Sequence, residues 1–148
     1  MAKFIFRLES ILKLKEQQKK ELELELAKIQ VKRIEAENEL INIIREKEER
    51  RQKIIKPHCI QVSNYQVEYY YLDFLDKKIE NQNKKIERIQ KLEHSVINDL
   101  LKITKEKKII EKFKERKKEA FDKENLRLEN LFLDDLSQRI KTHLKLSE

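Results

Sequence analysis

Apolar residues recur at helical spacing over the first third of the chain. The steps alternate between four and three residues, apart from a double step of four at Leu22 that predicts a stutter in the repeat. A 3.5-residue repeat places one narrow stripe of side chains against a partner helix. We therefore expect one helix over about residues 4–55. Its stripe comprises Phe4, Leu8, Ile11, Lys15, Gln18, Leu22, Leu26, Ile29, Arg33, Ala36, Leu40, Ile43, Lys47, Arg50 and Ile54.

A second, longer series begins at Leu72 and continues in steps of three and four residues to Leu131. Twelve of its eighteen positions are apolar, whereas the chain-wide share of 39% would give about seven. A repeat kept for this long predicts a coiled coil. Since no helix-breaking residue follows Ser63, we expect this second helix to cover about residues 64–144.

Residues 56–63 separate the two series. Pro57 disfavours helical geometry at the residue before it, and Ser63 followed by Gln66 forms a capping box that starts the second helix. A short break between two long amphipathic helices predicts an antiparallel hairpin. In that hairpin partner residue numbers sum to about 119 and Phe4 lies near Glu115.

The expected fold is therefore all-α. It is a long two-helix antiparallel coiled-coil hairpin, a single domain over residues 1–148, with a single-helix overhang from about residue 116. The absence of glycine supports long helices, because most compact folds need residues that tolerate positive φ.

Composition also bears on chemistry. Without glycine there is no loop that cradles a phosphate or a dinucleotide, and the three histidines and the single cysteine are too scattered for a metal site. We therefore expect no enzyme activity, no metal, no cofactor and no small-molecule substrate; Cys59 and His58 are loop residues. No stretch approaches the roughly 20 apolar residues of a membrane span or resembles a signal peptide. The expected location is cytoplasmic, with peripheral membrane association at most.

The net charge of +7 is concentrated in two segments. Residues 102–118 hold nine basic and three acidic side chains, and residues 1–17 hold four basic and two acidic side chains. The hairpin brings these two segments together, and we call them the basic collar. A basic collar suits an acidic partner. Nucleic acid is one candidate, but glutamates interrupt the collar and the overhang lacks the mixture of basic and aromatic residues of a single-strand groove.

The expected overhang keeps an apolar stripe that an unpaired helix cannot bury. An isolated amphipathic helix is marginal in water. Fraying or self-association is one interpretation, and ordering of the segment inside a partner protein is the other, which we prefer. The stripe consists of Phe121, Leu128, Leu131, Phe132, Leu133, Leu136 and Ile140.

All four tyrosines lie just after the turn. With Leu72 and Leu75 fixed inward, helical geometry turns Tyr65 inward, sets Tyr69 beside the seam and puts Tyr71 at its border. The side chains that point away are Val67, Tyr70 and Phe74. This outer stripe fits a protein-docking patch or, equally, packing of the 56–63 loop onto the helix.

Three segments resemble the FliJ family, the rod-shaped components of the bacterial flagellar protein export apparatus. The sequence "FIFRLESILKLKE" at 4–16 resembles the family's N-terminal signature. The aromatic segment at 63–82 and the Lys/Glu-rich segment at 105–136 resemble its later parts, and the latter ends in Glu129, Leu133, Asp134 and Asp135. The resemblance covers nearly the whole chain; the Pro-His-Cys turn and Asp135 depart from the pattern.

The resemblance implies a stalk similar to the central subunit of rotary ATPases. Such a stalk enters the pore of the hexameric flagellar export ATPase, promotes ring assembly, contacts the cytoplasmic region of the membrane export gate and helps recycle export chaperones. We assign ATPase binding to Lys107, Lys108, Lys112, Lys117, Phe121, Leu128 and Leu131. We assign gate binding to Tyr70, Tyr71, Phe74 and Leu75.

Other classes stay open at this point. The equivalent stalk of a virulence type III secretion system would look the same, and a basic nucleic-acid-binding coiled coil is a further alternative. The rotor of a true rotary ATPase usually carries additional structure. The seams could also pair between two chains as an extended dimer.

Overall fold

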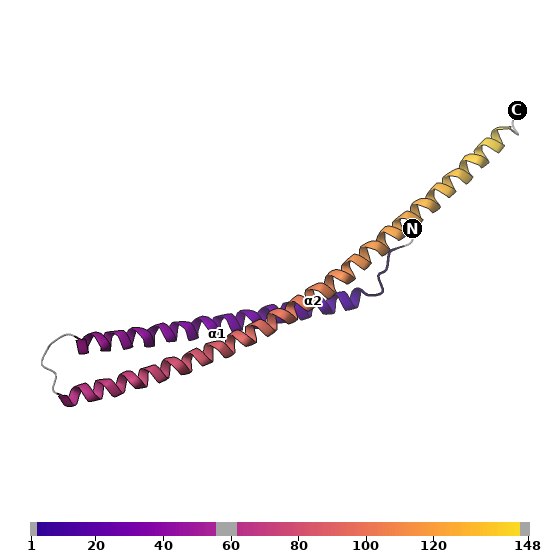
Figure 1. The fold of residues 1–148 in the computed structure, drawn as a ribbon. Coiled ribbons are helices and arrows are strands. Elements are labelled where there is room, and N and C mark those ends of the chain that lie inside the picture. Colours follow the sequence, from indigo (N-terminus) through magenta and orange to yellow (C-terminus); the bar gives the residue numbers. More distant parts are fainter. Residues whose placement is uncertain (1–2, 56–61, 146–148) are drawn as a thin grey trace. The chain divides into compact units, whose positions relative to one another are not determined.

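The protein is a two-helix chain in which α1 spans Glu9–Ile55 and α2 spans Val62–Lys145. The computed structural model describes residues 3–55 and 62–145 (Figure 1). The predicted helices are confirmed, and α2 starts two residues before its predicted first residue, 64. Pro57, His58 and Cys59 lie outside the described residues, so the predicted turn remains a prediction. Because α2 already begins at Val62, Ser63 lies inside the helix and does not precede it as the predicted capping box requires.

The prediction that the first helix begins at about residue 4 is wrong. Residues 3–8 are not helical, and α1 begins at Glu9, whose amide donates to the carbonyl of Phe6 at 3.2 Å. From Lys3 to Leu8 the side chains alternate between exposed and half-buried. This period of two is typical of an extended segment lying on a surface.

Contacts divide the chain into two compact units. The hairpin unit is Lys19–Lys102, and the terminal unit combines Met1–Gln18 with Ile103–Glu148. Both helices contribute to both units, and each unit is described separately below.

In the hairpin unit, α1 and α2 pack against each other in opposite directions. Arg33 pairs with Glu93 at 3.0 Å, and nearer the turn Arg50 pairs with Glu68 at 3.0 Å. The fully or nearly fully buried side chains are Ala36, Ile43, Leu75, Ile86 and Val96. A seam this narrow depends on a few buried residues, and full burial of a Leu, Ile or Val side chain contributes roughly 1.5–3 kcal/mol.

Polar contacts across the same unit fix its register. The Gln82 amide donates to the Ala36 carbonyl and to Glu39, both at 2.8 Å, and Lys85 lies 3.2 Å from Glu39. The bond from Gln82, followed by that from Lys85, lowers the pKa of the Glu39 carboxyl. Exposed pairs of this kind add little stability, so their role is to select one alignment of the helices.

The terminal unit packs residues 3–18 against the following part of α2. Glu9 pairs with Lys114 at 2.6 Å and Lys15 pairs with Glu106 at 2.7 Å. The predicted register, in which partner residue numbers sum to about 119, agrees with the packing of Phe6 on Phe113 in this unit and with the Gln82–Ala36 contact in the hairpin unit. The long side chains of Glu9 and Lys114 reach each other across about one turn.

The predicted seam of α2 is confirmed from Leu72 to Lys114, where all thirteen positions are buried or half-buried. In α1 the exception is Ile11, which is 41% exposed, whereas Leu12 is half-buried in its place. With Leu12 and Lys19 in the seam, the steps of four and three continue through Leu22. The heptad repeat of α1 is therefore regular through Leu22, and the predicted stutter is absent from it.

Neither described helix is long and apolar enough to cross a membrane.

Candidate functional site

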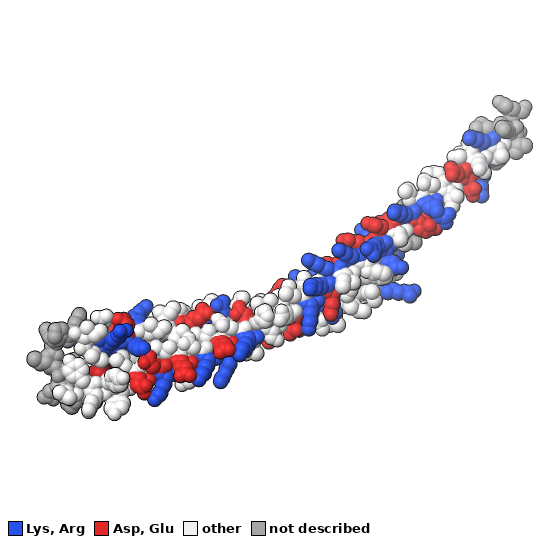
Figure 2. All heavy atoms as spheres, in the orientation of Figure 1, with Lys and Arg blue, Asp and Glu red and all other residues white. Residues whose placement is uncertain are grey.

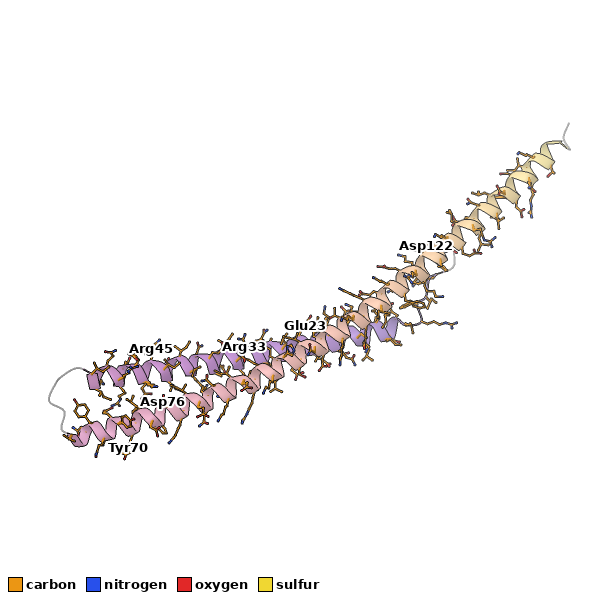
Figure 3. All side chains as sticks on the ribbon, in the orientation of Figure 1. Glu23, Arg33, Arg45, Tyr70, Asp76 and Asp122 are labelled. Carbon is orange, nitrogen blue, oxygen red and sulfur yellow. The ribbon has the colours of Figure 1, made fainter. Side chains whose placement is uncertain are left out.

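An exposed aromatic surface lies on the first turns of α2, within the hairpin unit. Tyr70 is 74% exposed and Phe74 is 53% exposed, with Val67 exposed on the same side. Figure 3 shows Tyr70 on the outside of α2, away from α1. We call Val67, Tyr70 and Phe74 the tyrosine face; their outward orientation confirms the prediction from helical geometry.

Tyr71 links this face to α1. Its hydroxyl donates a hydrogen bond to Glu46, and its ring lies under the Arg50 guanidinium, 4.9 Å from the ring centroid. The bond to Glu46 raises the pKa of the Tyr71 hydroxyl, because the carboxylate accepts a hydrogen bond from its neutral form. The Tyr71 ring also lies 6.0 Å from the Phe74 ring. Tyr71 therefore holds the tyrosine face in place and offers little free surface of its own.

Leu75 lies beneath this surface. It was assigned to gate binding, but its side chain is fully buried between the helices, so it can only support the face from below. Tyr65 is 38% exposed, so it does not point fully inward as predicted. Tyr69, predicted to lie beside the seam, is exposed.

The basic collar is partly neutralised in the terminal unit. Lys107 is largely buried in the seam and lies near Glu16 and Glu111, at 3.9 and 3.6 Å. Lys114 contacts Glu9 and lies 5.8 Å from the centre of the Phe6 ring. Basic and acidic side chains are also interspersed over the visible surface of the chain (Figure 2). Lys107 therefore contributes to packing, and its predicted role in ATPase binding remains a prediction.

Three collar lysines remain on the surface. Lys108 and Lys112 are exposed and lie one turn apart on the same side of α2. Lys117 is exposed on another side, with its ammonium 5.4 Å from the centre of the Phe113 ring. The helix thus distributes the predicted lysines over at least two faces, so they do not form one patch.

The last part of α2 carries exposed apolar residues. Every described side chain from residue 126 to residue 142 is exposed, including Leu128 and Leu131 at 50% each. Phe121 is half-buried, because Phe4 packs on it with the ring centroids 5.6 Å apart. We call residues 124–140 the apolar tip. Its uncovered part begins about ten residues after the predicted start at residue 116, because the extended segment before α1 reaches farther along α2 than a helix would.

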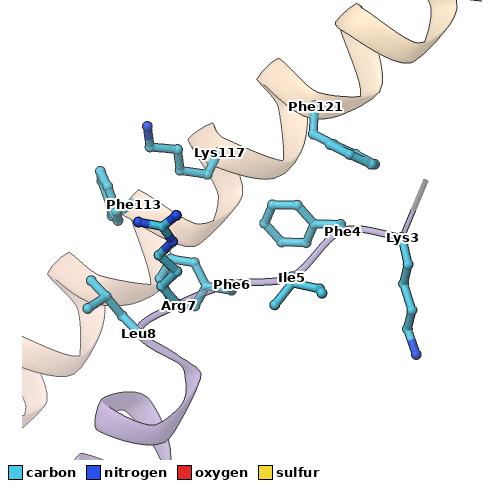
Figure 4. Close-up of a pocket in the computed structure, with 9 residues that line it drawn as sticks. All are labelled: Lys3, Phe4, Ile5, Phe6, Arg7, Leu8, Phe113, Lys117 and Phe121. Carbon is cyan, nitrogen blue, oxygen red and sulfur yellow. The ribbon is translucent and has the colours of Figure 1, made fainter.

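The sequence reasoning missed a groove in the terminal unit. Residues 3–8 run alongside α2 and line with it an open hollow of about 830 Å³ (Figure 4). The Phe6 and Phe113 ring centroids lie 6.1 Å apart, and the Phe4 ring packs against that of Phe121 in a tilted arrangement. The signal was the alternation of "FIFRL", which fits an extended strand-like segment better than a helix. The lining residues are Lys3, Phe4, Ile5, Phe6, Arg7, Leu8, Phe113, Lys117 and Phe121.

In the part of the chain that the structure describes, no cluster of three or more His, Cys, Asp or Glu side chains could hold a metal ion. The features that the structure does present are the tyrosine face, the groove with its basic and apolar lining, and the apolar tip. Their chemistry is that of binding other macromolecules through apolar contact and charge.

Two long helices packed along a 3.5-residue seam, with such surfaces outside the seam, define a coiled-coil interaction protein. Comparison with family models identifies the kind: the model of the flagellar FliJ protein matches residues 4–143. The chain therefore belongs to the FliJ family and is a component associated with flagellar protein export. Comparisons with curated proteins and with solved structures gave no match.

Proposed function

We propose that this chain is a non-catalytic stalk of the flagellar export apparatus. It binds the hexameric export ATPase, promotes assembly of the ring and couples it to the membrane export gate. The observation that carries the proposal is the apolar tip, on a chain whose match to the FliJ family spans residues 4–143. Because that family is flagellar, we place the chain in the flagellum and not in a virulence secretion system.

The apolar tip is the ATPase-binding surface in this proposal. Leu131 and Phe132 expose half or more of their surface, and a helix with such residues gains stability when a partner covers them. The central pore of a ring would cover the helix from all sides, which suits the wide distribution of these side chains. Lys108 and Lys112 of the collar add attraction to acidic groups of the ring.

The tyrosine face is the gate-binding surface. Tyr70 and Phe74 are large and exposed, and Phe74 packs against Tyr71, so little side-chain entropy of Phe74 is lost when a partner binds it. The chain would work at the cytoplasmic side of the inner membrane, at the flagellar basal body, where ATPase and gate meet. Export chaperones are further partners in this proposal.

The test is to titrate the purified chain into the flagellar export ATPase of the same organism. We expect faster ATP hydrolysis together with a shift of the ATPase toward hexamers in sedimentation. A matched control is the variant with both Leu128→Asn and Phe132→Asn. Its hairpin should still fold, but it should no longer stimulate ATP hydrolysis by the export ATPase. No complex and no stimulation with the unaltered chain would refute the stalk function.

A further inference from the structure

The groove of the terminal unit has a definite chemical preference. Six of its nine lining residues are apolar and the other three, Lys3, Arg7 and Lys117, are basic. Phe4 and Phe121 lie next to each other in the groove, with Arg7 and Lys117 among its lining residues (Figure 4). Such a groove fits an apolar ridge flanked by negative charge.

The apolar tip of the same chain has this complementary chemistry. Leu128, Leu131 and Phe132 are exposed along the tip. The tip, residues 124–140, contains four acidic and two basic side chains, a net charge of −2. The groove is therefore basic and apolar, and the tip is acidic and apolar.

A tip cannot reach the groove of its own chain. Phe113, Phe121 and the tip belong to one continuous helix, α2, and residues 102–148 contain neither glycine nor proline. Folding back would require breaking that helix, which no residue of this segment favours. Since a second copy carries both complementary surfaces, we propose that two copies of the chain form an antiparallel dimer in which the apolar tip of each occupies the groove of the other.

The two surfaces lie on the same side of α2, as a two-fold dimer requires. At about 100° per residue, Phe113, Lys117 and Phe121 of the groove fall within an arc of about 80°. Leu128 and Asp135 of the tip fall inside the same arc. One face of α2 thus presents the groove first and the tip farther along, so two antiparallel copies can satisfy both at once.

Helix geometry also gives a register for the dimer. Lys117 and Asp135 are equally distant from residue 126 and lie on the same line along α2, and both are exposed. A two-fold axis at residue 126 places Lys117 of each copy opposite Asp135 of the other. The same axis places Phe121 opposite Leu131. The overlap from residue 113 to residue 139 is about 40 Å long.

The dimer would cover the surface that the proposed function assigns to the ATPase. Dimerisation and ATPase binding would then exclude each other, and the dimer would be a storage form of the chain. Dimerisation itself does not depend on the proposed function, because its test uses the chain alone.

The experiment is sedimentation equilibrium of the full chain over a range of concentrations at low and high salt. We expect a monomer–dimer equilibrium that weakens as salt rises. Lys117→Glu and Asp135→Lys should each weaken dimerisation about tenfold or more, since each places like charges opposite one another. Lys108→Glu makes the same change of charge on the opposite side of α2 and should leave the equilibrium unchanged.

Mixing the two variants separates this arrangement from others. In a heterodimer of Lys117→Glu with Asp135→Lys, both groove–tip contacts again join opposite charges, so the mixture should dimerise more strongly than either variant alone. The chain carrying both substitutions should likewise dimerise with itself. A wild-type chain that is monomeric at all concentrations would overturn the proposal, and so would a dimer that Lys117→Glu leaves intact, because the seams would then be paired in another way.

Discussion

The Tyr71 hydroxyl donates a hydrogen bond to the Glu46 carboxylate and so joins α2 to α1 near the turn. The bond uses the neutral form of the phenol, which is why the pKa of Tyr71 is raised above its ordinary value of 10.0. A raised pKa in the folded state means that the contribution to stability is complete below pH 10.0 and is lost as the pH rises through the folded pKa.

Replacement of Tyr71 by Phe should reveal this linkage. The difference between the tyrosinate absorbance of the wild type and of Tyr71→Phe gives the titration of Tyr71 alone, and its midpoint should lie above pH 10.0. The wild type should melt at a higher temperature than Tyr71→Phe at neutral pH, and the two should converge at strongly alkaline pH. Tyr70→Phe, which removes the hydroxyl of an exposed ring, is the control and should not change the melting temperature at neutral pH. A midpoint below pH 10.0 would contradict the bond.

The seam could be predicted because its apolar residues recur every three and four positions in the sequence. Leu75, Ile86 and Val96 are buried where the repeat placed them. The register followed from the position of the break between the two series: Phe6 packs on Phe113 and the Gln82 amide reaches the Ala36 carbonyl, pairs whose residue numbers sum to 119 and 118.

The groove was missed for a different reason. An apolar series at helical spacing and an alternating extended segment both bury Phe4 and Leu8, so the first residues satisfied either interpretation. What separates them is Phe6, which the helical series leaves out and which packs on Phe113 in the structure. Of the candidate binding residues, the exposed Tyr70 and Phe74 followed from helical geometry. The burial of Lys107 did not, because the sequence does not show which lysines pair across the seam.

Leu75→Ala should destabilise the hairpin strongly. The side chain is fully buried, and removing three carbons from such a site costs about 2–5 kcal/mol of the free energy of unfolding. Urea denaturation followed by circular dichroism measures the loss. Leu92→Ala, on the same helix at a side chain that is 60% exposed, is the matched control and should cost well under about 1 kcal/mol. Equal effects of the two substitutions would mean that Leu75 is not in the core.

The double substitution Tyr70→Ala and Phe74→Ala tests the tyrosine face. Both side chains are exposed, so the helix content and the urea midpoint should change little. Loss of two aromatic anchors should weaken gate binding and reduce swimming in soft agar. Ile41→Ala with Leu92→Ala removes a comparable exposed apolar surface elsewhere in the hairpin unit and should leave swimming unchanged. Normal swimming by the Tyr70–Phe74 variant would refute the role of this face.

Reversing the charge of Lys108 and Lys112 tests the collar. Both are exposed on the side of α2 opposite the groove, so the substitutions to Glu should spare the dimer but weaken binding to the export ATPase. The loss should be largest at low salt, because screening removes the attraction in both proteins at high salt. Lys107→Glu, at a side chain packed in the seam near Glu16, should instead lower thermal stability. ATPase affinity that is unaffected at low salt would exclude these two lysines from the interface.

The apolar tip can be divided by face, which separates a ring that surrounds the helix from a partner on one side. Leu128→Asn with Phe132→Asn alters the face that continues from Phe121. Leu126→Asn with Leu133→Asn alters a face about 120–140° away, at side chains of similar exposure. If the ATPase pore encloses the tip, both pairs should reduce stimulation of ATP hydrolysis, whereas only the first pair should affect the dimer. Stimulation that survives both pairs would show that the tip does not contact the ATPase, and would leave the groove–tip dimer as its remaining role.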